Sequence, residues 1–158
     1  MRRNAGDLAA AVCAAAFVIV LAVSAYWDRS IRILHAVEAL PYIVAAILVL
    51  RQNKFGYALG TVSGVFWLFM AAFRTTFVRN GFERLLANDW SRPDLLIAVP
   101  AALATGGLAL FSIVGYARQP KRSRDALLFA AALVLVPLFF VAIFAAFAPR
   151  FLGMFRPR

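Results

Sequence analysis

Five long apolar stretches constrain this chain more than any other feature. They cover residues 8–27, 33–50, 55–73, 95–117 and 126–148, and four of the five carry no charged residue. A hydrocarbon layer about 30 Å thick needs roughly 20 apolar residues in a helix that rises about 1.5 Å per residue. Inside lipid each segment must satisfy its own backbone polar groups, which favours helices. The sequence therefore predicts an all-α integral membrane protein with five transmembrane helices, folded as one domain over residues 1–158.

The composition agrees with this class and weakens one alternative. Hydrophobic residues make up 64% of the chain, whereas soluble domains contain about 45–50%. The net charge of +10 is also typical of nucleic-acid-binding proteins. However, the basic residues lie between or beside the apolar stretches, where cations meet anionic lipid headgroups. We therefore expect a lipid bilayer as the partner and no nucleic acid.

The basic residues also predict contacts and an orientation. The densest cluster lies between the fourth and fifth stretches, and a second group lies in the tail beyond residue 148. We expect the following residues to contact headgroups: Arg118, Lys121, Arg122, Arg124, Arg150 and Arg156. Placing the dense cluster in the cytoplasm also places the N-terminus there. Abundant alanine and arginine are typical of high-GC bacterial proteins, which indicates the bacterial inner membrane.

The first stretch allows a second interpretation. Arg2 and Arg3 precede an apolar run that ends in Val23-Ser24-Ala25, as in a cleaved signal peptide. The run is longer than the usual signal core, and Asp7 interrupts its basic start. A retained helix is the favoured interpretation.

The ends of the stretches carry helix-start residues and interfacial aromatics. We expect caps or capping boxes at three starts: Asn4 with Asp7, Ser91 with Asp94, and Ser123 with Asp125. Amphipathic aromatic rings concentrate at the membrane–water interface. Rings expected there are Tyr26, Trp27, Tyr57, Trp90 and Tyr116.

The connection over residues 74–94 is long enough to hold a short helix. Val78, Phe82 and the pair Leu85–Leu86 fall on one helical face, whereas Arg79 and Glu83 lie largely opposite. This pattern predicts a short interfacial helix between the third and fourth spans. Gly81 weakens the prediction, because glycine disfavours helix.

Small residues repeat every four positions in two spans. Gly56, Gly60 and Gly64 line one face of the third span; Ala98, Ala102 and Gly106 do so in the fourth. Such faces let two helix backbones approach closely in lipid. We expect packing within the chain against span two or span four, with the small-residue face of span four as a plausible partner. A contact between subunits and a ligand on the bare face are the alternatives.

One polar stripe enters the membrane. Arg32, His35, Glu38 and Tyr42 project from a similar side of the second span. A carboxylate at the depth of Glu38 is costly unless it is paired, and Arg32 or His35 is the natural partner. The stripe is therefore a salt-bridged structural cluster or, alternatively, a proton- or cation-coupled site. A haem or metal at His35 is disfavoured, because no second histidine exists.

The remaining residues indicate no chemistry of their own. Cys13 is the only cysteine, so neither an intramolecular disulfide nor a cysteine-based metal site is expected. We expect no catalytic residues, no metal and no cofactor. The leading hypothesis is a non-catalytic accessory or stabilising subunit that packs beside other transmembrane subunits or itself. The alternative is a small oligomeric transporter or channel that uses the stripe in the second span.

Overall fold

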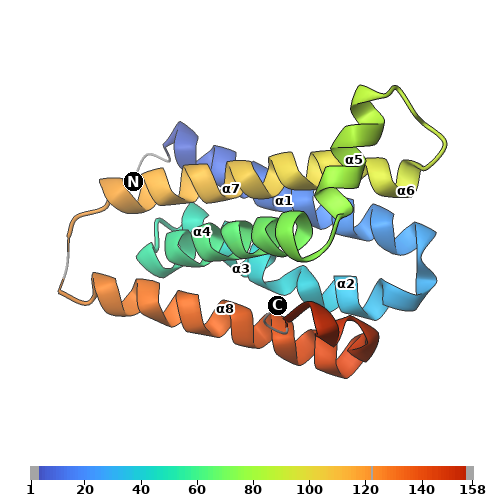
Figure 1. Ribbon diagram of the computed structural model, residues 1–158. Coiled ribbons are helices and arrows are strands. Elements are labelled where there is room, and N and C mark those ends of the chain that lie inside the picture. Colours follow the sequence, from blue (N-terminus) through green and yellow to red (C-terminus); the bar gives the residue numbers. More distant parts are fainter. Residues whose placement is uncertain (1–3, 122, 156–158) are drawn as a thin grey trace.

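The structure is a computed structural model that describes residues 4–121 and 123–155. Within these residues the regular secondary structure is entirely helical (Figure 1). The elements are α1 (Ala5–Trp27), η1 (Arg29–Ile31), α2 (Arg32–Glu38), α3 (Leu40–Leu50), α4 (Lys54–Phe69), η2 (Met70–Arg74), α5 (Phe77–Leu86), α6 (Pro93–Leu96), α7 (Ala98–Arg118), α8 (Asp125–Phe147) and η3 (Pro149–Phe155).

The predicted helical class and the five apolar helices are confirmed. The helices long and apolar enough to cross a membrane are Ala5–Trp27, Arg29–Leu50, Lys54–Arg74, Pro93–Arg118 and Asp125–Phe147. Their bounds differ from the predicted stretches by a few residues only. Three of them are composite, because short helical pieces join end to end: η1, α2 and α3; α4 and η2; α6 and α7.

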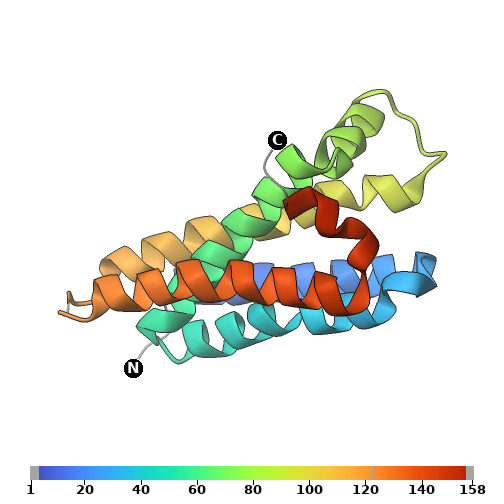
Figure 2. The ribbon, with the colours of Figure 1, turned by 60° about the horizontal axis from the view of Figure 1, so that its bottom comes forward.

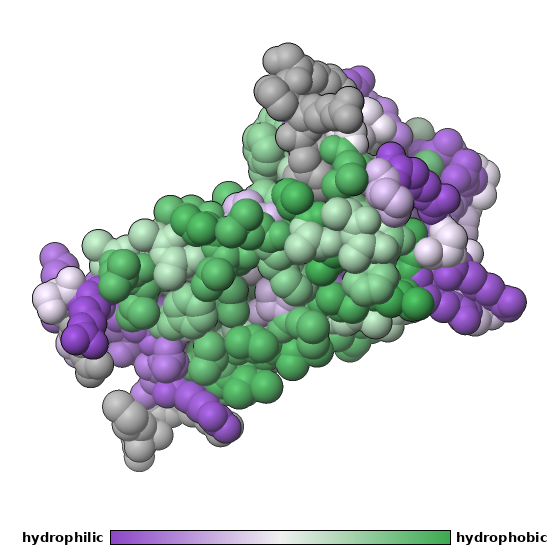
Figure 3. Space-filling view, turned by 90° about the horizontal axis from the view of Figure 1, so that it is seen from below, coloured by the Kyte–Doolittle hydropathy of each residue, from purple (hydrophilic) through white to green (hydrophobic). Residues whose placement is uncertain are grey.

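The spans form a bundle around α4. This helix packs against α3, α7 and α8, while α1 packs against α3 and α7. α8 lies on the outside, where it contacts α4 and α2, and η3 turns back from its end toward η2 (Figure 2). Apolar side chains cover the middle of the bundle and polar side chains gather at its two ends (Figure 3). This banded surface is the one expected of a chain solvated by lipid.

The two ends of the bundle are built from different connections. We call the "closed end" the start of α1 together with the turn at residues 51–53 and the connection at residues 119–124. The "cavity end" comprises residues 28–31, residues 75–97 and residues 147–155. Figure 1 shows the two ends on opposite sides of the bundle.

One of the three predicted helix starts is confirmed. Asn4 and Asp7 form a capping box on α1. The predictions for Ser91 and Ser123 are wrong, because α6 and α8 begin without a side-chain cap. The acidic residues near these two starts form salt bridges instead. Asp94 pairs with Arg92 at 2.7 Å, and Asp125 pairs with Lys54.

Two spans are interrupted close to a proline. Span two breaks at Ala39, two residues before Pro41, and span four breaks at Ile97, three residues before Pro100. Proline has no N–H for the helical ladder and its ring crowds the preceding turn, which explains both breaks. Pro137, by contrast, lies within the continuous helix α8. The first break directly follows Glu38.

The third span ends in a π-helical turn. α4 gives way at Met70 to η2, which continues to Arg74. Such turns widen a helix locally and are frequent at functional sites. This turn lies beside the cavity described below.

The long connection between the third and fourth spans contains a helix, α5, and Gly81 allows this helix to pack closely against span four. A Cβ on Gly81 would lie 2.8 Å from both Ala98 Cβ and the Leu95 carbonyl oxygen. Glycine is therefore what allows α5 to rest on the start of span four. The predicted apolar face stays open, since Leu86 is 86% exposed and Phe82 and Leu85 are also exposed.

Candidate functional site

The glycine face of α4 packs against two helices of the same chain. A Cβ on Gly60 would lie 2.5 Å from Ser112 Oγ of α7, and one on Gly64 would lie 2.5 Å from the Thr105 carbonyl oxygen. A Cβ on Gly56 would lie 2.4 Å from Leu48 Cβ of α3. These approaches are too short for any side chain, so the small residues bring helices together within the chain.

The small residues of span four are not the partners that the spacing suggested. Ala98 lies against Gly81 of α5, and Gly106 contacts only the Leu68 side chain of α4. Ala102 is half-buried. The residues that meet Gly60 and Gly64 are Thr105, Leu108, Ala109 and Ser112. Their face of α7 is rotated from the predicted one.

A buried hydrogen-bond cluster joins α1, α4 and the turn at residues 51–53 at the closed end. Tyr57 Oη donates to Asp7 Oδ1 at 2.7 Å, and Gln52 Nε2 donates to Asp7 Oδ2 at 3.3 Å. The backbone N–H of Asn4 also donates to the Asp7 carboxylate. Tyr57 is fully buried, so its prediction as an interfacial ring was wrong. Each partner satisfies a charge or phenol that would otherwise be costly to bury.

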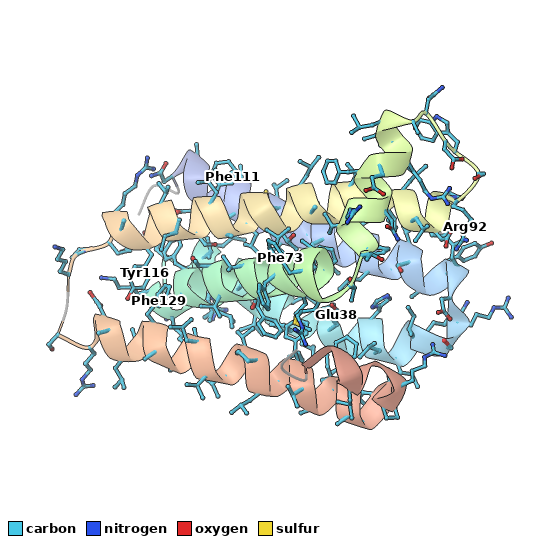
Figure 4. All side chains as sticks on the ribbon, in the orientation of Figure 1. Glu38, Phe73, Arg92, Phe111, Tyr116 and Phe129 are labelled. Atoms are coloured by element: carbon cyan, nitrogen blue, oxygen red, sulfur yellow. The ribbon has the colours of Figure 1, made fainter. Side chains whose placement is uncertain are left out.

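A second cluster closes the same end between α4, α7 and α8. Lys54 Nζ pairs with Asp125 and donates to the Pro120 carbonyl at 2.8 Å. Tyr116 Oη donates to the Asp125 carbonyl at 2.7 Å, and its ring packs edge-on against Phe129 (Figure 4). The polar groups of these two clusters thus bind each other and link the helices at the closed end.

The interior of the cavity end is hollow. A cavity of about 330 Å³ lies between the helices there, within the roughly 300–1,000 Å³ typical of small-molecule sites. Every one of the five spans contributes to its walls. The lining residues are Phe17, Val20, Leu21, Ser24, Ile31, Leu34, His35, Glu38, Trp67, Met70, Ala71, Thr75, Phe77, Ile97, Ala101, Phe140 and Phe144.

Aromatic rings form much of the cavity wall. Phe17 packs against Trp67 with ring centroids 5.0 Å apart, and Trp67 meets Phe77 edge-on. Phe140 and Phe144 of α8 complete the aromatic part of the wall. Aromatic rings thus line the space between the helices here, whereas the glycines of α4 bring helices close together.

One polar pair faces this apolar space. His35 Nδ1 lies 2.9 Å from Glu38 Oε2, and His35 Nε2 lies 3.2 Å from Ser24 Oγ of α1. Glu38 is only 3% exposed and points into the bundle (Figure 4). His35 and Glu38 are the only ionisable residues among the described residues that line the cavity. The pair therefore sets the charge of the cavity.

The remaining members of the predicted stripe lie apart from the pair. Arg32 is exposed, and its Nε donates to the Ala25 carbonyl at 3.0 Å. Tyr42 is buried against Phe17 and donates to the Ser63 carbonyl at 3.3 Å. The four residues thus form no continuous polar path, and the partner of Glu38 is His35 and not Arg32.

The predicted headgroup residues divide between the ends. Arg118, Lys121 and Arg124 are exposed at the closed end. Arg150 is exposed at the cavity end, where its Nη2 donates to Ser30 Oγ at 2.8 Å. Arg122 and Arg156 lie outside the described residues.

A charged turn accompanies Arg150. Ser30 donates through both its hydroxyl and its amide to Asp28 Oδ1, at 2.6 and 2.9 Å. These hydrogen bonds, with a smaller contribution from Arg150, hold the pKa of the Asp28 carboxyl below its ordinary value. The turn fixes the connection between α1 and α2 just outside the cavity.

Sequence reasoning found the His35–Glu38 pair but missed the cavity. The aromatic lining comes from different spans, and a tertiary arrangement is needed to bring it together. No group of three or more His, Cys, Asp or Glu residues capable of holding a metal occurs in the described part of the chain. Comparison with family models, curated proteins and solved structures finds no match to this chain.

Proposed function

We propose that this protein is a non-catalytic membrane protein that binds a small, largely apolar molecule in the cavity at its cavity end. The observation that carries the proposal is an apolar, aromatic-lined space of about 330 Å³ with one buried polar pair on its wall. A mostly apolar pocket with a few convergent polar groups is the usual form of a small-molecule site.

This proposal follows the transporter alternative more closely than the accessory-subunit hypothesis. The small-residue face that favoured an accessory role is occupied by helices of the same chain. Within the stripe, only His35 and Glu38 reach the cavity. The arrangement supports a discrete binding site better than a continuous channel lining.

The placement in the membrane belongs to the same proposal. We infer five crossings, with the start of α1 and the end of α8 on opposite sides. α5 would lie in the interface, with its exposed leucines toward lipid. Arg118, Lys121 and Arg124 would meet anionic headgroups on the cytoplasmic side of a bacterial inner membrane.

The test uses Trp67, the tryptophan of the cavity wall. In a Trp27→Phe/Trp90→Phe background, Trp67 is the only indole left of three. The protein in mild detergent is titrated with 4-bromobenzyl alcohol, whose bromine quenches a tryptophan that it touches. Ala101→Phe, which fills the cavity from α7, is the matched control for probe that enters the micelle.

We expect saturable quenching of Trp67 in the open-cavity protein. The filled variant should show only a weak quenching that rises linearly with probe. Equal quenching curves in the two proteins would refute ligand binding at this site.

An accessory subunit is the second candidate, and α8 favours it. This helix lies on the outside of the bundle and exposes apolar side chains along its length, including Leu127, Leu133, Leu135 and Leu138. Purification in mild detergent at native expression level, followed by mass spectrometry, tests it. A stoichiometric membrane partner that is lost on Leu135→Trp would support the subunit role, and migration of the chain alone would reject it.

A further inference from the structure

The charge of the cavity depends on a single proton. When the His35 imidazole is neutral, Nδ1–H donates to the Glu38 carboxylate, and Nε2 accepts the Ser24 hydroxyl. The pair then carries one negative charge. When the imidazole is protonated, the pair has no net charge.

The second carboxylate oxygen of Glu38, Oε1, is available to accept a hydrogen bond. The contact with His35 uses Oε2, and no described residue donates a hydrogen bond to Oε1. A carboxylate accepts hydrogen bonds through both oxygens. A cationic or N–H donor group inside the cavity would satisfy the second oxygen and balance the charge.

The aromatic wall favours the same class of ligand. Phe17, Trp67, Phe77, Phe140 and Phe144 all line the cavity. The face of an aromatic ring attracts a cation within about 6 Å of its centroid, and the attraction is strongest in a site without water. An anion would find no described basic side chain other than His35 on the lining.

We infer that the ligand is a small lipophilic cation, such as an aromatic ammonium ion, and that it competes with the proton on the His35–Glu38 pair. This inference rests on the proposed function, because it assumes that the cavity takes a ligand. Binding of the cation is strongest when the pair has lost its proton. Cation entry therefore releases a proton, and proton uptake expels the cation.

Other ionisable groups near the pair do not line the cavity. Asp28 lies in the connection before η1, close enough to His35 for their charges to interact. Tyr42 of α3 makes no hydrogen bond to Glu38 and donates to the Ser63 carbonyl instead, and Arg74 ends η2 beside the lining residue Thr75. Arg150 of η3 lies next to Asp28. The arginines keep their charge at all working pH values, and Asp28→Asn tests the contribution of the turn.

The experiment compares two probes of the same shape. Benzyltrimethylammonium carries a cationic nitrogen where neopentylbenzene has a neutral carbon. Each probe displaces 4-bromobenzyl alcohol from the Trp67-only protein, and recovered fluorescence reports its affinity. Measurements at about pH 5.5 and about pH 8.5 bracket the ordinary titration range of histidine.

We expect benzyltrimethylammonium to bind at least about tenfold more tightly at the higher pH, while neopentylbenzene changes by less than about twofold. Glu38→Gln, which keeps the shape but loses the charge, should weaken binding of the cation about tenfold or more at the higher pH and remove most of the difference between the two pH values. Asp28→Asn should retain the pH effect. The comparison of the two pH values in the Trp67-only protein needs no substitution at Glu38. It therefore tests the cation inference even if Glu38→Gln fails to fold.

Each contrary result has a distinct meaning. If neopentylbenzene binds and the ammonium does not, the proposed function stands and the cation inference is wrong. The inference is also wrong if the ammonium binds equally at both pH values. If neither probe nor 4-bromobenzyl alcohol binds saturably, the proposed function itself fails.

Discussion

The two ends of the bundle use the same helices in opposite ways. At the closed end, Asp7 and Tyr57 join α1 to α4, and between this end and the middle of the span Gly60 and Gly64 bring α4 against α7. At the cavity end, aromatic rings line a space of about 330 Å³. The contact between α4 and α7 therefore resembles a well-packed core, whereas the apolar interior at the cavity end retains unfilled volume.

Local backbone features accompany this difference. Span two breaks at Ala39, span four breaks at Ile97, and span three changes to a π-helical turn at Met70. All three irregularities adjoin or include residues that line the cavity, namely Glu38, Ile97 and Met70, and irregular backbone in a membrane protein is tolerated where it lines a cavity. We propose that the polar and small-residue contacts stabilise the bundle and that the cavity carries its function.

The largest effect is expected from adding one methyl group where α4 packs closely against α7. Gly64→Ala places a Cβ 2.5 Å from the Thr105 carbonyl oxygen, and only movement of the α7 backbone relieves that contact. We expect a loss of about 3 kcal/mol of stability in detergent, as in overpacked cores. Gly106→Ala is the control, because its Cβ would lie 3.7 Å from the flexible Leu68 side chain. Thermal unfolding that affects both variants equally would contradict close packing at Gly64.

A matched pair of alanine substitutions compares the two ends directly. Ala58 and Ala101 are both buried, at 0% and 1% exposed, but only Ala101 lines the cavity. We expect Ala58→Leu to destabilise by about 2 kcal/mol and Ala101→Leu to change stability by less than about 1 kcal/mol, because the cavity has room for the added carbons. Thermal unfolding of both variants in one detergent measures the difference. Equal losses would mean that the two ends are equally packed.

The hydrogen bond between Tyr57 and Asp7 tests the polar part of the closed end. Tyr57→Phe keeps the ring and removes the 2.7 Å bond to the buried carboxylate. We expect a loss of about 1.5 kcal/mol, the low end for a bond to a charged group, since the Gln52 and Asn4 bonds remain. Tyr116→Phe, which loses a bond to a backbone carbonyl instead, should cost less. An unfolding temperature equal to wild type in Tyr57→Phe would show that the cluster contributes no stability.

The smallest effect is expected at the exposed turn of the cavity end. Ser30→Ala removes both the hydroxyl bond to Asp28 and the contact with Arg150, so the pKa of Asp28 should rise toward its ordinary value. A lowered pKa stabilises the folded state above the unfolded pKa, and that contribution disappears as the pH falls through the folded pKa. The variant should therefore lose part of this acid-side dependence, because the Ser30 backbone amide still donates to Asp28. Carbon-13 NMR of the Asp28 carboxyl measures the shift, and an unchanged titration would exclude the Ser30 hydroxyl as a cause.

The fold was more predictable than the site, for physical reasons. Span length and apolar content are local properties, so the five helices were found within a few residues of their ends. The rotation of a helix about its axis depends on its neighbours. The face of α7 that meets Gly60 was therefore predicted incorrectly, and Tyr57 was placed in the interface although it is fully buried.

The site was predictable only where its members lie close in sequence. His35 and Glu38 are three residues apart on one helix, and their pairing was among the alternatives. Trp67 and Phe140 come from spans three and five, and nothing in the spacing of either residue indicates a shared cavity. One sequence signal did mark this part of the site: Pro41 lies three residues after the buried carboxylate of Glu38 and predicts a helix break beside it.

Accessibility of single cysteines tests the contrast between the ends most directly. In a Cys13→Ala background, Ala101→Cys places a thiol on the cavity wall and Ala58→Cys places one in the packed core. Both variants are treated in mild detergent with benzyl methanethiosulfonate, a small apolar reagent, and labelling is followed by intact-protein mass spectrometry. We expect the cysteine at position 101 to react at least about tenfold faster, since a packed interior has few voids larger than water. Equal rates at the two positions would contradict an open cavity end beside a packed closed end.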